Sequence, residues 1–180
     1  MKSFIAATFL IVHALLLSVS LPISQCRVVV QTDEHLIEST CRKTSSFGLC
    51  VSSLKSDPQS SKADVPGLGL IMVNVIKAKA TKTLNHIRVL LKRGPGAVER
   101  RALISCVENY EAILKGDVPE AIEALTKGDY KFAEQGSNDA ANEANTCERE
   151  FTAGTSPLTA LNNNVHDVSA IAAAITRTLL

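Results

Sequence analysis

The sequence predicts an all-α protein, an antiparallel up-and-down four-helix bundle with an N-terminal helical hairpin extension and two disulfides. Three observations lead to this prediction. Apolar residues recur at intervals of three and four along most of the chain, and no stretch alternates in the way that a half-buried strand would. The first residues have the pattern of an export signal. Four of the five cysteines then form an even set in the exported part, as expected for bridges in an oxidising compartment.

Residues 1–24 are predicted to be a signal peptide. Lys2 gives a positive start, an apolar run follows at 4–17, and cleavage is expected after Ser20 or Ser24. The apolar run falls short of the ~20 residues that a membrane span needs. The full chain has 19 Lys and Arg and 18 Asp and Glu. Either cut removes Lys2 alone among them, so the mature chain has a formal charge of zero, which argues against nucleic acid or a membrane as an electrostatic partner.

Residues 33–56 are expected to form the helical hairpin. Two segments, 33–43 and 46–55, have helical patterns, but each is too short to be stable alone. A cross-link or packing against the bundle is therefore needed to hold them.

The first two bundle helices follow in the region 64–180. Asp64 is expected to cap the first helix, and Gly94-Pro95-Gly96 is expected to end it. The second helix carries apolar residues from Leu103 to Leu125. Within it, Asp117 and Glu120 resemble a capping box, so this helix either kinks there or restarts.

The third and fourth helices complete the bundle. The third has an Ala-rich stripe that includes Ala140 and Cys147, with Ser137 as its expected cap. The fourth is opened by Ser156 as N-cap and Pro157 at the first helical position. Four helices with short connections predict the up-and-down arrangement.

The cysteines lie at positions 26, 41, 50, 106 and 147. Cys41, Cys50, Cys106 and Cys147 form the even set, and Cys26 lies near the start of the mature chain. Four cysteines allow three pairings, and spacing alone does not choose among them.

Catalytic and metal sites are not predicted. His35, His86 and His166 lack metal-ligand spacing, and no nucleophile elbow or Gly-rich phosphate loop is present. The sequence therefore favours a binding protein over an enzyme, without cofactor. The first long helix is basic, and a solvated face is the expected explanation for its charges.

A set of short motifs resembles the plant invertase and pectin methylesterase inhibitor family, and within it the cell-wall and vacuolar inhibitors of beta-fructosidase. The resemblance extends from about residue 36 to the C-terminus. The motifs that carry it are Cys41-x8-Cys50, Ser56-Asp57-Pro58, Asp117-Val118-Pro119-Glu120-Ala121, Lys131-Phe132, Cys147 and Ser156-Pro157-Leu158.

The resemblance implies a four-helix bundle with an N-terminal hairpin, and it pairs Cys41 with Cys50 and Cys106 with Cys147. Cys26 has no family partner. It also implies a secreted or vacuolar inhibitor that binds acid invertase and occludes the active site. The alternative within the family is an inhibitor of pectin methylesterase, which would be bound through faces of the bundle helices.

The invertase-directed branch carries a Pro-Lys-Phe motif for this contact. Here the chain reads Asp129-Tyr130-Lys131-Phe132, with Tyr in place of Pro, and the loop is therefore expected to be less preorganised. A retaining glycosidase holds two carboxylates about 5 Å apart, an anionic site that suits an ammonium group. Lys131 would enter that site and Phe132 would anchor beside it. The alternative is a solvated loop lysine and an ordinary core ring.

Overall fold

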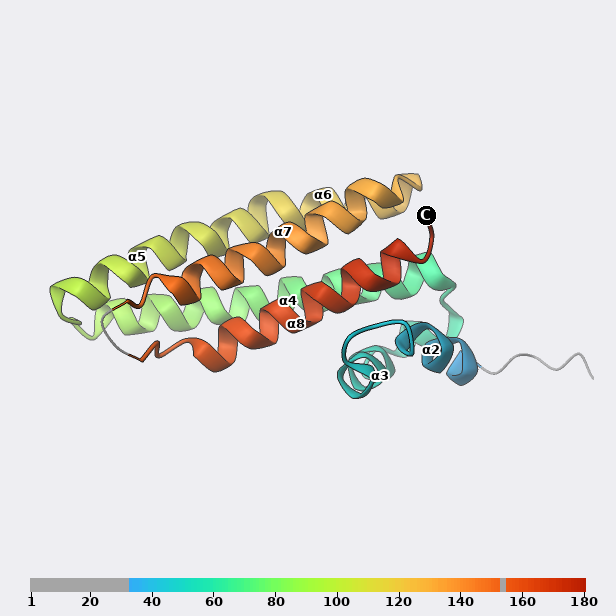
Figure 1. Cartoon of the computed structure of the whole chain (residues 1–180), viewed down its shortest axis with the longest axis horizontal. Coiled ribbons are helices and arrows are strands. Elements are labelled where there is room, and N and C mark those ends of the chain that lie inside the picture. The colour runs from blue at the N-terminus through green and yellow to red at the C-terminus, as the bar shows by residue number, and fades with distance from the viewer. Residues whose placement is uncertain (1–32, 153–154) are drawn as a thin grey trace, which may run out of the picture. The chain divides into compact units, whose positions relative to one another are not determined.

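The computed structural model describes residues 33–152 and 155–180, and all regular elements in that part are helices (Figure 1). The predicted all-α fold class is confirmed. These residues belong to one compact unit, Gln31–Leu180. The signal peptide prediction and Cys26 lie outside the described residues. No helix in the described ranges is long and apolar enough to cross a membrane.

The N-terminal hairpin consists of α2 (Asp33–Cys41) and α3 (Phe47–Lys55). A disulfide joins Cys41 to Cys50, with their Cα atoms 5.6 Å apart. Lys55 also pairs with Glu34 across the hairpin at 2.5 Å. A short 3₁₀ helix (Pro58–Lys62) then leads into the bundle. The cross-link and the burial of apolar residues explain why two nine-residue helices hold together here.

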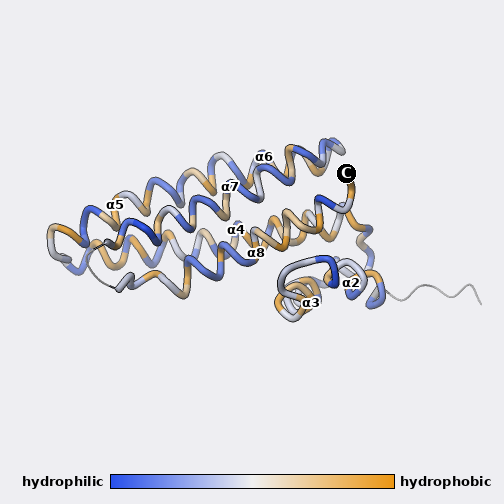
Figure 2. The backbone as a smooth tube through the Cα atoms, in the orientation of Figure 1, coloured by the Kyte–Doolittle hydropathy of each residue, from blue (hydrophilic) through white to orange (hydrophobic). Residues whose placement is uncertain are grey.

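The four helices of the bundle run alternately up and down, and each combines apolar and polar residues along its length (Figures 1 and 2). The second of them is formed by two α-helices joined through a π-helical segment. The elements are α4 (Val65–Lys92), α5 (Ala97–Ala112), the π-helical segment η3 (Ile113–Asp117), α6 (Val118–Lys127), α7 (Tyr130–Arg149) and α8 (Thr159–Arg177).

Two predicted helix boundaries agree with the structure. Asp64 caps α4, because its Oδ1 accepts a hydrogen bond from Gly67 N at 2.9 Å. Gly94 follows the end of α4 with φ 72°, a left-handed conformation that glycine adopts without steric cost.

The predicted capping box at Asp117 and Glu120 is wrong. Asp117 has helical dihedrals and caps nothing, so the chain continues from α5 into α6 without a new helix start. Gly136 of α7 lies against this junction, since a Cβ there would be 2.8 Å from the carbonyl oxygen of Asp117. The close contact with α7 accompanies a wider π-helical turn where the sequence suggested a cap.

The predicted caps at Ser137 and Ser156 are also wrong. Ser137 is buried in the interior of α7, and its hydroxyl donates to Ala133 O at 2.9 Å. Ser156 Oγ instead accepts from Leu158 N in a turn that precedes α8, which begins at Thr159. Serine can form local hydrogen bonds inside helices and in turns as well as at caps, which is why its presence misplaced both caps.

The core is mainly aliphatic, and two connections tie its helices together. A second disulfide joins Cys106 of α5 to Cys147 of α7, with Cα atoms 4.7 Å apart. Tyr110 is fully buried and donates to Asn162 Oδ1 at 2.8 Å, while Asn162 Nδ2 donates to Glu148 Oε2 at 2.6 Å. These contacts connect α5, α7 and α8 through satisfied polar groups.

Candidate target-binding site

A two-residue turn between α6 and α7 positions the candidate site. Gly128 ends α6 with φ 80°, and Asp129 N reaches back to Ala124 O at 2.8 Å, as in a Schellman motif. Asp129 O then accepts from Phe132 N at 3.0 Å and starts α7. The turn is therefore short and closed by backbone hydrogen bonds at both ends.

Lys131 and Phe132 lie in the first turn of α7, so the expectation that they occupy a loop is wrong. The helical backbone fixes their directions without any help from proline. Tyr130 occupies the first helical position, where an N–H group has no intrahelical partner and Pro and Tyr are both compatible with the helix. The half-buried Tyr130 ring also packs against the core.

Phe132 is 57% exposed, which excludes the alternative of an ordinary core ring. It borders a shallow surface hollow of about 160 Å³ formed mainly by α6. Lys131 beside it is exposed as well. An aromatic ring left in water at a helix end is a candidate anchor for a partner protein, because covering it recovers hydrophobic free energy.

The position of Lys131 is unfavourable for the stability of α7. The N-terminal turn of a helix carries the positive end of the macrodipole, where a cation costs a few tenths of a kcal/mol or more. The first turn of α7 contains no acidic residue, and Lys131 takes part in none of the ion pairs within the described ranges. The Lys131 ammonium group is therefore exposed at this helix end, while Asp129 precedes the helix and Glu120 and Glu123 line the adjoining hollow.

The neighbouring Lys127 differs from Lys131 in its environment. Its Nζ donates to Glu123 on the same helix, and this hydrogen bond raises the pKa of Lys127 while it lowers that of Glu123. Lys127 is therefore engaged within its own helix. It is a suitable control for Lys131, being close in sequence and equally charged.

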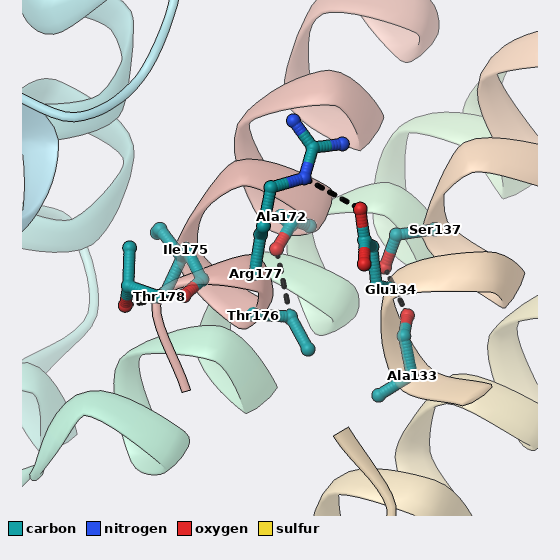
Figure 3. Close-up of polar contacts among 8 residues, drawn as sticks. All are labelled: Ala133, Glu134, Ser137, Ala172, Ile175, Thr176, Arg177 and Thr178. Atoms are coloured by element: carbon teal, nitrogen blue, oxygen red, sulfur yellow. Dashed lines mark hydrogen bonds and ion pairs between the residues drawn. The ribbon is translucent and has the colours of Figure 1, made fainter. Parts of the chain in front are cut away.

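Contacts to α8 hold the first turns of α7 in place (Figure 3). Glu134 Oε1, one turn after Tyr130, accepts from Arg177 Nε at 2.6 Å. The Glu134 side chain is largely covered by its neighbours. Sequence reasoning missed this pair, because the two residues are 43 positions apart and carry no local motif.

Of the four residues predicted for the site, Tyr130, Lys131 and Phe132 share one helical turn, and the side chain of Asp129 makes no capping hydrogen bond. The described residues contain no group of His, Cys, Asp and Glu suited to a metal ion. His35, His86 and His166 lie apart, on α2, α4 and α8. What the geometry offers is a rigid helix end that presents a cation and an aromatic ring.

The fold is a disulfide-linked helical bundle that leaves this cation and aromatic ring exposed at one helix end. The chain belongs to the plant invertase/pectin methylesterase inhibitor family, whose model matches residues 35–175.

Individual relatives show the same relationship. The chain is 48% identical over 144 residues to the cell wall / vacuolar inhibitor of fructosidase 1 of Arabidopsis thaliana, covering 80% of this chain and 69% of that one. It is 33% identical to the pectinesterase inhibitor of Actinidia deliciosa, over 72% of this chain and 69% of the relative. A crystal structure of a mutant pectin methylesterase inhibitor from Arabidopsis superposes with a TM-score of 0.69 at 25% identity, covering 80% of this chain and 97% of that one.

Proposed function

We propose that this protein inhibits plant acid invertase by binding the enzyme and occluding its active site. Relatives named as inhibitors of fructosidase support this choice of target. The observation that carries the proposal is the exposed Lys131-Phe132 pair on the first turn of α7.

The mechanism requires binding and no bond-making chemistry. The Lys131 ammonium enters the anionic cleft of the glycosidase and pairs with a carboxylate that the enzyme uses in catalysis. Phe132 is buried against the rim of the cleft, where it supplies hydrophobic contact and excludes water from the ion pair. Because the helical turn is already formed, little ordering is required on binding. Sugar cannot enter while the helix end occupies the cleft.

The proposed location is the cell wall or the vacuole, reached through the secretory pathway. The predicted signal peptide, the two disulfides and the name of the relative from Arabidopsis thaliana support this location. The proposal also makes the chain an inhibitor rather than an enzyme, consistent with its family.

A second candidate target is pectin methylesterase. The relative from Actinidia deliciosa and the superposable Arabidopsis structure both favour it. That enzyme would be bound through faces of the bundle helices, and Lys131 would be dispensable.

Titration of purified acid invertase and of purified pectin methylesterase with the mature protein separates the two targets. We expect stoichiometric loss of invertase activity and no loss of pectin methylesterase activity. Inhibition of the methylesterase alone would reverse the assignment.

A further inference from the structure

The longest helix, α4, has an unbalanced charge. Its 28 residues include five Lys or Arg and no Asp or Glu. Arg88 pairs with Glu111 of α5 at 3.2 Å. The other four cations take part in no ion pair within the described part of the chain. Like charges one turn apart, such as Lys79 and Lys82, repel each other, so only Lys92 in the last turn is placed favourably for helix stability.

A surface groove of about 450 Å³ lies beside this helix, within the size range of small-molecule sites. Its lining contains no acidic residue and comes from two helices. The lining residues are Lys82, Asn85, His86 and Val89 of α4 and Leu161 of α8. The basic helix α4 therefore borders a concave surface. A helix face that is only solvated would not need one.

The groove combines three kinds of group. Lys82 supplies a positive charge, and Asn85 and His86 supply hydrogen-bonding groups. Val89 and Leu161 supply apolar surface, and Val89 is 46% exposed. A ligand that matches all three is a ring with an apolar C–H face, hydroxyl groups at its edge and a carboxylate.

The positive potential extends beyond the groove. Arg93, at the C-cap of α4, lies eleven residues after Lys82 on the same side of the helix, about 16 Å along its axis. On the other wall, Leu161 lies two residues after the start of α8, whose first turn is already paired with the Glu148 carboxylate through Thr159 and Asn162. A ligand with carboxylates repeated along a chain can pair with both Lys82 and Arg93, which a single small anion cannot.

We propose that the groove binds a uronate unit of a carboxylated polysaccharide, with the carboxylate paired to Lys82 and the polymer continuing toward Arg93. The site is separate from the Lys131-Phe132 pair. Gly69, near the start of α4, packs against Leu125 close to the α6–α7 turn, and the groove begins thirteen residues farther along α4. Both surfaces can therefore be occupied together, so the polysaccharide would hold the protein in an anionic matrix without blocking its target.

Single-stranded nucleic acid fits the groove less well. Its bases are normally bound by stacking on large aromatic rings, and neither α4 nor α8 contains a Phe, Tyr or Trp. An acidic peptide would pair with Lys82. It has no sugar ring, however, to cover Val89 and Leu161 and to hydrogen-bond with Asn85 and His86.

The test is calorimetric titration of the mature protein with an oligomer of galacturonic acid at low ionic strength, where ion pairs are least screened. A fully methyl-esterified oligomer of the same length is the neutral control, and polyglutamate of similar charge is the peptide control. We expect the acidic oligomer to bind at least tenfold more tightly than either control. Lys82→Gln should weaken this binding at least fivefold and leave inhibition of the target enzyme unchanged.

Lys62→Gln is the matched control variant, because Lys62 is also exposed but lies in the 3₁₀ helix before α4. We expect it to change oligomer affinity less than twofold, and circular dichroism should show both variants folded. The proposal is overturned if the acidic oligomer does not bind, if polyglutamate or the esterified oligomer binds equally well, or if the two variants lose the same affinity.

Discussion

The carboxyl of Asp117 is partly buried within the second bundle helix and caps nothing, where the sequence predicted a helix cap. Its Oδ2 is buried without a hydrogen-bond partner. Burial raises the pKa of its carboxyl to about 7, and three acids that face it add to the effect, Asp139 and Glu143 from α7 and Glu120 from α6. Lys115, two residues before Asp117, pairs with Glu111 instead. The carboxyl is therefore protonated in mildly acidic solution.

This pKa predicts that the protein is more stable in acid than at neutral pH. Between the unfolded pKa of about 3.9 and the folded value, the native state holds a proton that the unfolded state has lost, so stability falls as pH rises through this window. Allowing for partial solvent screening, we expect a loss of about 1–2 kcal/mol between pH 4.5 and 7.5, a decrease in Tm of roughly 3–6 °C.

Asp117→Asn removes the titrating group and should abolish most of that decrease, raising Tm at pH 7.5 relative to the parent. Calorimetric melting at the two pH values measures it. Asp167→Asn, at an exposed carboxyl on α8, is the control and should keep the parental pH dependence. A parental pH dependence in Asp117→Asn would show that another group is responsible.

At the scale of elements, the contact between α7 and the π-helical junction is the tightest that a glycine makes in the described part of the chain. A Cβ at Gly136 would be 2.8 Å from a backbone oxygen, which cannot move aside as a side-chain end can. Gly136→Ala should therefore push α7 away from the junction and cost about 1–3 kcal/mol.

Gly116→Ala is the matched control, because Gly116 lies in the π-helical segment itself and a Cβ there meets nothing within 4 Å. It should be neutral or stabilise by up to about 1 kcal/mol through helix propensity. Urea unfolding of both variants measures the difference. Equal stabilities would mean that α7 does not rely on this close approach.

The elements also show what the sequence determines locally. Asp64 and Gly94 have chemical roles at helix ends that a neighbouring helix does not change, so the corresponding boundaries were predictable. Ser137 was misassigned because a serine hydroxyl has a second local use: it accepts from a backbone N–H at a cap, but here it donates to the carbonyl oxygen of Ala133 inside the helix. The junction at Asp117 depends on the approach of α7, which no local pattern reveals.

The candidate site was predictable in part for the same reasons. The Lys131-Phe132 motif was found from family resemblance. That the two residues are helical follows from the two-residue turn at Gly128 and Asp129, whose length became clear only from its backbone hydrogen bonds. The pairing of Glu134 with Arg177 could not be predicted, because a contact between residues far apart in the chain does not change the periodicity of apolar residues.

At the scale of the whole molecule, the disulfides should contribute much of the stability. Closing the ten-residue loop at Cys41–Cys50 is worth roughly 3 kcal/mol and closing the longer loop at Cys106–Cys147 roughly 4 kcal/mol by the chain-entropy estimate. Since a domain of this size has a total stability of only about 5–15 kcal/mol, reduction should lower Tm by more than about ten degrees. Melting with and without reductant measures this, and an unchanged Tm would contradict it.

The central claim is that the end of α7 is the part of the molecule that closes the invertase active site. The most direct test is the inhibition constant of Lys131→Ala against acid invertase, beside Lys127→Ala, whose lysine is engaged with Glu123. Because Lys131 opposes the helix dipole, its removal should leave Tm equal or slightly higher. Inhibition should nevertheless weaken about thirtyfold, or roughly 2 kcal/mol, and Lys127→Ala should stay within about threefold of the parent. If Lys131→Ala inhibits invertase as well as the parent does, the account of this site is contradicted.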